Sequence, residues 1–219
     1  MMNYNIFTKE VVEVFQQNLL NLLNSDIDFQ NKYIVSNPRA VGDAVQEMIG
    51  ENLIKCFPDN LVRVCNETFA RRSLADVAFY DNENNYYAVD IKTHNKNTSF
   101  NMPNLTSVKR LSEFYESDSN FFVILLVEYS AIDGKIVFDN VYFVPIEHFS
   151  WNCLNIGALG EGQIQIANAN VISIDTTQNR KQWMLQLCDR LNIFYPKEIA
   201  KIEKRIAKVE KVRNFWQTK

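Results

Sequence analysis

The chain contains few of the residues that interrupt regular secondary structure (Gly and Pro) or cross-link the backbone (Cys). The 219 residues include 6 Gly, 5 Pro and 4 Cys, and the cysteines form no Cys-x-x-Cys pair. A disulfide framework or a zinc site is therefore poorly supported, and we expect buried free thiols in a reducing compartment. The scarcity of Gly and Pro excludes a collagen-like or low-complexity chain. We expect one domain over residues 1–219, large enough to bury a proper core.

Long apolar runs are also missing. The longest, "FFVILLV" at 121–127, has the length of a buried strand, whereas a membrane span needs about 20 residues. The N-terminus lacks the basic start and apolar centre of a signal peptide, which predicts a cytoplasmic protein without a membrane partner. Gly157, Gly160 and Gly162 do not fit the glycine patterns of nucleotide-binding loops, so no nucleotide cofactor is expected.

An overall excess of basic residues is absent as well, because the net charge is −3. The charges are unevenly distributed, however. Between Ile91 and Leu111 there are three Lys, one Arg and one His but no acid, and residues 197–219 contain eight Lys or Arg against three Glu. Two basic segments in an acidic chain are expected if one face meets a polyanion. Solvated surface charge explains the C-terminal segment equally well.

Hydrophobic periodicity predicts helices at both ends of the chain and strands between them. Helices are expected near residues 5–24 and from Pro38 onward, followed by strands over 61–69, 74–80 and 86–93. A short helix over 105–117 precedes strands over 120–130 and 136–146. Two helices, 179–192 and 196–216, close the chain. This order predicts a mixed α/β or α+β domain, mainly helical over 1–57, with a central mixed sheet flanked by helices.

Charged residues interrupt one apolar strand, "YYAVDIKT". Because side chains alternate along a strand, Asp90 and Lys92 share one face, while Val89 and Ile91 face the core. Asp76 lies on the preceding strand, and a hairpin would bring it close to both. Two carboxylates at a strand end make a hard oxygen site for Mg²⁺. A neighbouring lysine can hold a phosphate, and it can position or deprotonate the attacking water.

The predicted second helix supplies further acids about one turn apart. We take Glu47 as the catalytic candidate there, with Asp43 and Glu51 as alternatives. A surface ion pair would explain Asp90 and Lys92 taken alone. An unpaired charge within an apolar strand is costly, however, and acids both precede the strand and lie on the helix. Together these features predict a metal-dependent nuclease site.

These residues resemble a known signature. "LAD" followed by "AVDIK" is similar to the PD-(D/E)xK nuclease motif. "AVDIKT" and "DIKTHNKNTSFNMPNLTSVKRL" resemble more closely the blunt-cutting type II restriction endonucleases of the HincII and EcoRV kind, as do "NRKQWMLQLCDRL" and the basic last helix. The resemblance implies a restriction-endonuclease-like fold. It also implies Mg²⁺ held by Asp76, Asp90 and the Ile91 carbonyl, with Lys92 as the catalytic lysine.

The same resemblance implies contacts with DNA. Asn101 falls where the family has a glutamine that inserts between bases, Met102 replaces a small alanine, and Asn104 matches an asparagine that touches bases. Candidate phosphate contacts are the nearby basic residues His94, Lys96, Lys109 and Arg110. An amide-rich run either reads base edges or is ordinary loop polarity: Asn155, Gln163, Gln165, Asn168 and Asn170.

The expected function is that of a type II restriction endonuclease. With Mg²⁺ it would hydrolyse phosphodiester bonds in both strands of a short palindromic double-stranded DNA site, leaving blunt ends with 5′-phosphates. A homodimer is expected, because two-fold protein symmetry matches a palindrome, and residues 178–219 would form a helical DNA-binding or dimer region. The alternatives are a DNA repair nickase or junction resolvase of the same fold, and a catalytically inactive DNA-binding module.

Overall fold

A five-stranded sheet lies at the centre of the molecule, in the order β1-β2-β3-β5-β6. The computed structural model describes residues 5–25, 37–65, 74–132 and 135–219. Only β3 and β5 run parallel, and the other neighbours are antiparallel, so the sheet is mixed. Its strands are β1 Val62–Cys65, β2 Val77–Asp81, β3 Tyr86–Asn95, β5 Asn120–Ile132 and β6 Lys135–Pro145.

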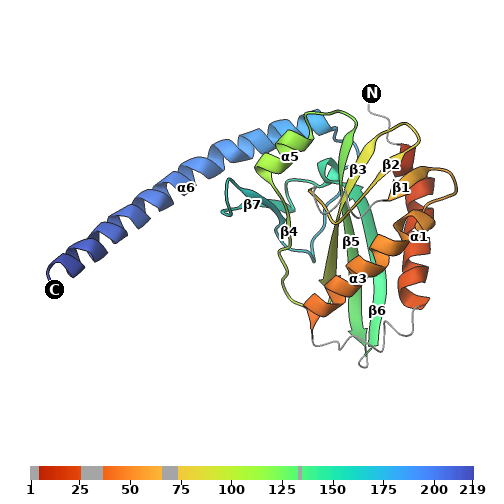
Figure 1. Ribbon diagram of the computed structural model, residues 1–219, viewed down its shortest axis with the longest axis horizontal. Coiled ribbons are helices and arrows are strands. Elements are labelled where there is room, and N and C mark those ends of the chain that lie inside the picture. The colour runs from red at the N-terminus through yellow and green to blue at the C-terminus, as the bar shows by residue number, and fades with distance from the viewer. Residues whose placement is uncertain (1–4, 26–36, 66–73, 133–134) are drawn as a thin grey trace.

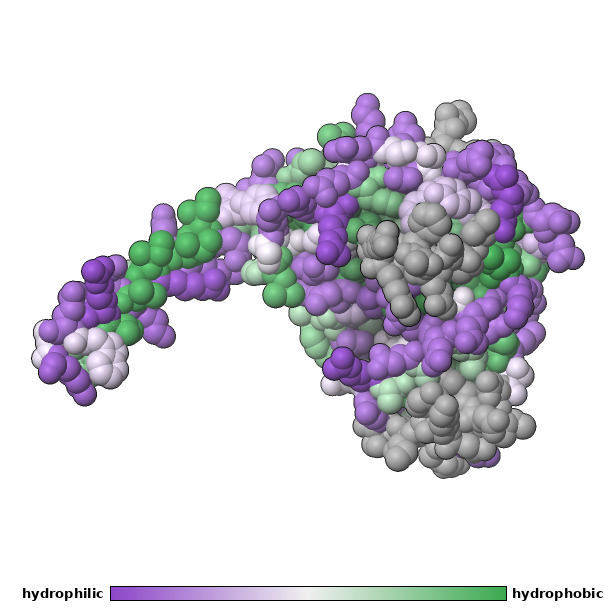
Figure 2. Space-filling model, in the orientation of Figure 1, coloured by the Kyte–Doolittle hydropathy of each residue, from purple (hydrophilic) through white to green (hydrophobic). Residues whose placement is uncertain are grey.

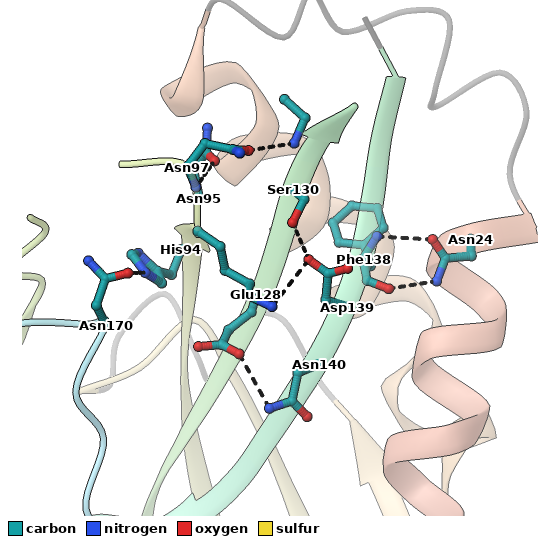
Figure 3. A network of polar contacts seen from close by, with 12 residues as sticks. Asn24, His94, Asn95, Asn97, Glu128, Ser130, Phe138, Asp139, Asn140 and Asn170 are labelled. Atoms are coloured by element: carbon teal, nitrogen blue, oxygen red, sulfur yellow. Dashed lines mark hydrogen bonds and ion pairs between the residues drawn. The ribbon is translucent and has the colours of Figure 1, made fainter. Parts of the chain in front are cut away.

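Two helices cover one face of this sheet. α1 (Lys9–Ser25) packs along β6 and α3 (Pro38–Asn52) packs against β3 (Figure 1). The Asn37 side chain accepts a hydrogen bond from the Ala40 amide, which caps the start of α3. On α1, Asn24 pairs with the backbone of Phe138 at the sheet edge (Figure 3). The 3₁₀ turns η1 (Asn5–Phe7) and η2 (Leu53–Cys56) complete this layer.

A second layer covers the opposite face. It contains α5 (Val108–Phe114), η3 (Ile146–His148) and a small antiparallel sheet of β4 (Asn104–Ser107), β8 (Gln163–Ile166) and β7 (Leu154–Gly157). The first turns of α6 (Arg180–Gln217) also pack here, with Trp183 and Leu187 buried. The predicted class, a mixed α+β fold with a central mixed sheet flanked by helices, is confirmed and agrees with a restriction-endonuclease-like fold.

β3 is buried on both faces by these two layers. Val89 and Ile91 belong to the core beneath α1 and α3, as the alternation predicts, and Ala88 belongs to the core on the other side. Asp90 and Lys92 continue the face of Ala88, where the apolar layer ends. The strand therefore holds an acid and a base on one face while the other face is fixed in the core.

Three predicted helices differ from the structure. The closing helices are one continuous 38-residue helix, because helical geometry continues through Pro196. A proline lacks the amide for one intrahelical bond, but the strong helix formers that follow it (Lys, Glu and Ala) continue the helix. The helix predicted over 105–117 begins only at Val108, where the Ser107 side chain accepts from the Arg110 amide, and the residues before it form β4.

The cysteine expectation is confirmed in part. Cys56 and Cys153 are free and buried, whereas Cys188 is exposed on α6. The strand predicted over 61–69 appears as β1, and its last residues lie outside the described part of the chain. Across residues 5–25, 37–65, 74–132 and 135–219, none of the helices combines the length and apolar character of a membrane span.

Candidate active site

Asp76 joins the start of β2 to the middle of β3. It lies one residue before β2 and is half-buried. Its amide donates to the Val89 carbonyl over 3.0 Å, and its Oδ2 accepts from the Ile91 amide over 2.7 Å. The carboxylate is therefore fixed beside the strand that carries Asp90, as the predicted hairpin requires. Ile91, whose carbonyl is a candidate metal ligand, is thereby brought together with Asp76.

Asp90 and Lys92 form an ion pair on one face of β3. Lys92 Nζ donates to Asp90 Oδ1 over 2.7 Å. The Asp90 side chain is only 7% exposed and that of Lys92 is 24% exposed. The second oxygen, Asp90 Oδ2, is buried without a hydrogen-bond partner among the described residues. A buried carboxylate oxygen without a partner is energetically costly, and a bound ligand would remove this cost. The atom is therefore available to bind a ligand from outside the protein.

The surroundings of Asp90 also change its acidity. Burial raises the pKa of Asp90 to about 7, the ion pair with Lys92 opposes this rise, and the neighbouring charge of Asp76 adds to it. A carboxyl group that titrates near neutral pH inside a protein is a frequent mark of a functional site. A bound cation would favour the ionised form, because it would neutralise the charge that burial penalises.

The acids of α3 approach the site from the Asp76 side. A cleft of about 500 Å³ is lined by Asp43, Gln46, Glu47, Gly50, Glu51, Asp76 and Val77. The helix residue that contacts Asp76 is Gln46, whose Nε2 donates to Asp76 Oδ1 over 2.8 Å. Glu47, the candidate from sequence, is exposed in the same cleft. α3 lies close to β3 here, since a Cβ added at Gly42 would come within 3.3 Å of Thr93 Oγ1.

Sequence reasoning missed Gln46 because it considered only charged helix residues. Gln46 lies one position before Glu47 and three after Asp43, so it shares part of the same polar face. Asp76 thus uses one oxygen for Ile91 and the other for Gln46. In the described parts of the chain, no three His, Cys, Asp or Glu side chains gather in the arrangement of a metal centre. The donors suited to a hard cation are the two carboxylates, and Asp90 Oδ2 is the unengaged one.

Lys109 and Arg110 are exposed at the start of α5. They line a hollow of about 470 Å³ whose walls include Leu74, two residues before Asp76, and Gly160. Basic side chains thus lie close to the loop that carries Asp76. This is where phosphate contacts would help to hold a nucleic acid near the carboxylates.

His94 lies inside the protein rather than on its surface. The side chain is fully buried, and its Nε2 is 2.9 Å from Asn170 Oδ1 (Figure 3). Its Nδ1 is 3.5 Å from Asn101 Nδ2. The tautomer with the proton on Nε2 satisfies both contacts, donating to Asn170 and accepting from Asn101. In this arrangement His94 does not reach a phosphate. It links β3 to the loop that carries Asn101.

The remaining DNA-contact candidates lie around that loop. Met102 is exposed, and Asn104 Oδ1 accepts from Gln165 Nε2 of the amide-rich run. The Ala169 amide donates to the Asn101 carbonyl over 2.7 Å, which ties the amide-rich run to the loop. Lys96 Nζ lies 3.8 Å from Asp139 Oδ2, so its charge is partly balanced within the protein.

Comparison with known proteins finds one informative similarity. The chain is 31% identical over 153 residues to the type II restriction enzyme HpaI of Haemophilus parainfluenzae. The matched region covers 60% of this chain and 56% of the relative, so the chain spans little more than half of that enzyme's length. No family model matches the chain.

Proposed function

We propose that this protein is a Mg²⁺-dependent type II restriction endonuclease that cleaves both strands of a short palindromic DNA site. The observation that carries the proposal is Asp90: a buried carboxylate beside Lys92 and Asp76 whose second oxygen has no partner among the described residues. Similarity to a type II restriction enzyme supports DNA as the substrate. A homodimer, one active site per strand, and blunt ends with 5′-phosphates complete the proposal.

The donor set suits a hard divalent cation. Asp90 and Asp76, with the Ile91 carbonyl, would hold Mg²⁺, since this ion prefers carboxylate and carbonyl oxygens. When bound, Mg²⁺ neutralises charge on the scissile phosphate and lowers the pKa of a coordinated water. The protein contributes rigidity: Ile91 and Val89 are fixed in the core, and the Ile91 amide fixes Asp76.

Lys92 acts on the phosphate and the attacking water. Its ammonium group is partly exposed on the face of Asp90, so an incoming phosphate can reach it. In the free protein Asp90 Oδ1 accepts a hydrogen bond from Nζ and holds it in place; with Asp90 engaged in holding the cation, Nζ would turn to the phosphate instead. The lysine then either orients the water as an ammonium group or, as the neutral amine after giving up a proton, accepts the proton of the water. Asp90 has to be ionised for this exchange, and a pKa near 7 makes the step sensitive to pH.

The experiment is digestion of supercoiled plasmid and of genomic DNA with and without Mg²⁺, followed by sequencing of the DNA ends. We expect linear plasmid and blunt ends centred on one palindrome, only with Mg²⁺. Nicked circles as the end product would support the nickase or resolvase alternative instead. Absence of cleavage on several DNAs that contain all short palindromes, with DNA binding intact, would overturn the proposal in favour of a binding module.

A further inference from the structure

The distal half of α6 projects away from the rest of the molecule (Figure 1). The helix is 38 residues long, about 57 Å at 1.5 Å per residue. Its beginning is firmly held: Arg180 Nε donates to the buried Glu147 over 3.0 Å, and Trp183 Nε1 donates to the Phe149 carbonyl over 2.9 Å. Every residue from 199 to 219 is exposed. The second half therefore receives no packing from the described parts of its own chain.

This exposed half nevertheless carries an apolar stripe. Ile199, Ile202, Ile206, Val209 and Trp216 are between 49% and 65% exposed. Figure 2 shows the stripe as a green band along the projecting helix. Scattered apolar residues are ordinary on a surface, but a continuous stripe on one helix face marks an interaction site.

The spacing of the stripe is that of a coiled coil. The residues follow one another by three, four and three positions, and Arg213 and Trp216 continue the same pattern. Alternating steps of three and four place side chains on one seam along a helix, over about two and a half heptads here. We call Ile199, Ile202, Ile206, Val209, Arg213 and Trp216 the α6 seam. The lysines of the segment lie off it, at positions 201, 204, 208 and 211.

We infer that the α6 seam pairs with the α6 seam of a second copy of this chain. An identical helix offers a matching stripe at the same spacing, which a symmetric dimer requires. One pair of charges beside the seam is also complementary to a parallel copy. In a parallel pair, which aligns the two seams over their full length, Arg205 faces Glu210 of the second copy, whereas Glu198 faces Glu203 and opposes the pairing. The seam would then be the dimer interface. This inference rests on the proposed function, in which a homodimer cleaves both DNA strands.

Arg213 limits the strength of this pairing. It is the one charged residue of the seam, and a polar side chain at such a position fixes register at a cost in stability. The pair is also short, so we expect a dimer that dissociates on dilution. Arg213→Leu, which removes this charge, should lower the dissociation constant of the dimer.

Sedimentation equilibrium over a range of concentrations tests the seam with the full-length protein. The wild type should be a dimer that dissociates on dilution, and Ile202→Lys with Ile206→Lys should raise the dissociation constant at least about tenfold, because two charges enter an apolar contact. The matched control is Ala200→Lys with Ala207→Lys, which adds the same charges off the seam. Circular dichroism checks that each variant remains folded. A wild type that is monomeric throughout, or a seam variant that dimerises like the control, would overturn the inference.

Charge exchange tests the identity of the partner. Arg205→Glu should weaken the dimer, and a second change, Glu210→Arg, should restore it. Restoration by Glu210→Arg supports a second copy as the partner, whereas failure to restore the dimer contradicts it. In plasmid digestion the seam variant should nick more than it linearises. Asp90→Asn should remain a dimer and should not cleave DNA. If the wild type is a dimer but has no nuclease activity, the proposed function is wrong while the inference about the seam still holds.

Discussion

The two faces of β3 have opposite properties although they share one backbone. Toward α1 and α3, Val89 is fully buried and Ile91 is 7% exposed, and both pack among apolar side chains. On the other face, Asp90 is nearly as buried but leaves one oxygen without a partner among the described residues, and Lys92 reaches the surface. Burial thus serves stability on one face and raises the energy of a charge on the other. Substitutions on the two faces should separate stability from activity.

The largest expected effect comes from Lys92→Ala. Loss of the ammonium group next to the scissile phosphate should reduce Mg²⁺-dependent cleavage by about 100-fold or more, because a preorganised charge at a reacting group contributes that much. DNA binding should persist. Single-turnover cleavage and a gel-shift assay measure the two quantities, with Lys135→Ala as an exposed control on β6. Equal activity of the two variants would remove Lys92 from the chemistry.

The buried charge of Asp90 predicts a pH-dependent stability. Its pKa is about 7 when folded against an ordinary value of 3.8, so the folded state keeps a proton between those pH values that the unfolded state has lost. The unfolding free energy should therefore fall as pH rises through this window, by on the order of a few kcal/mol. Urea unfolding at pH 5 and pH 8 without Mg²⁺ measures it. The same comparison for Asp90→Asn should lack this contribution, and identical pH profiles would contradict the raised pKa.

The apolar face should respond in stability. Val89→Ala removes two fully buried carbon atoms and should lower the unfolding free energy by about 2 kcal/mol. Denaturant unfolding gives this number, with the exposed Val137→Ala on β6 as the control. Cleavage by the folded fraction should change far less than in Lys92→Ala. A comparable loss of specific activity would show that the two faces are not separable.

The smallest effect is expected at Gln46. Gln46→Ala removes the hydrogen bond to Asp76 and should cost about 1 kcal/mol of transition-state stabilisation, or roughly fivefold in cleavage rate. Glu47→Ala is the matched test of the neighbouring acid in the same cleft. A larger loss for Glu47→Ala would make the acid, rather than the amide, the functional helix residue.

Much of this arrangement follows from local sequence pattern. Alternation along "YYAVDIKT" predicts which residues of β3 face the core, and a short turn before it predicts the position of Asp76. These features depend on neighbours in sequence and on the regular geometry of strands. The capped start of α3 at Asn37 and Pro38 is equally local.

Contacts between distant segments were beyond sequence reasoning. The partner of Asp76 on α3 is Gln46, thirty residues away in the sequence. A glutamine is uncharged, so a search for catalytic acids does not select it. His94 reads as a surface residue in a polar stretch, yet Asn170 and Asn101 enclose it. α6 continues through Pro196 because the helix propensities of the neighbouring residues together outweigh the effect of the proline. A rule that ends a helix at every proline does not include those propensities.

The most direct test is Mg²⁺-dependent cleavage by Asp90→Asn. The substitution keeps the shape of the side chain and removes the charge that a cation would bind. Asp59→Asn is the control, because Asp59 is an exposed turn residue before β1. We expect Asp90→Asn to be folded and to bind DNA without cutting it, while Asp59→Asn linearises plasmid like the wild type. Undiminished cleavage by Asp90→Asn would contradict the placement of the active site on β3.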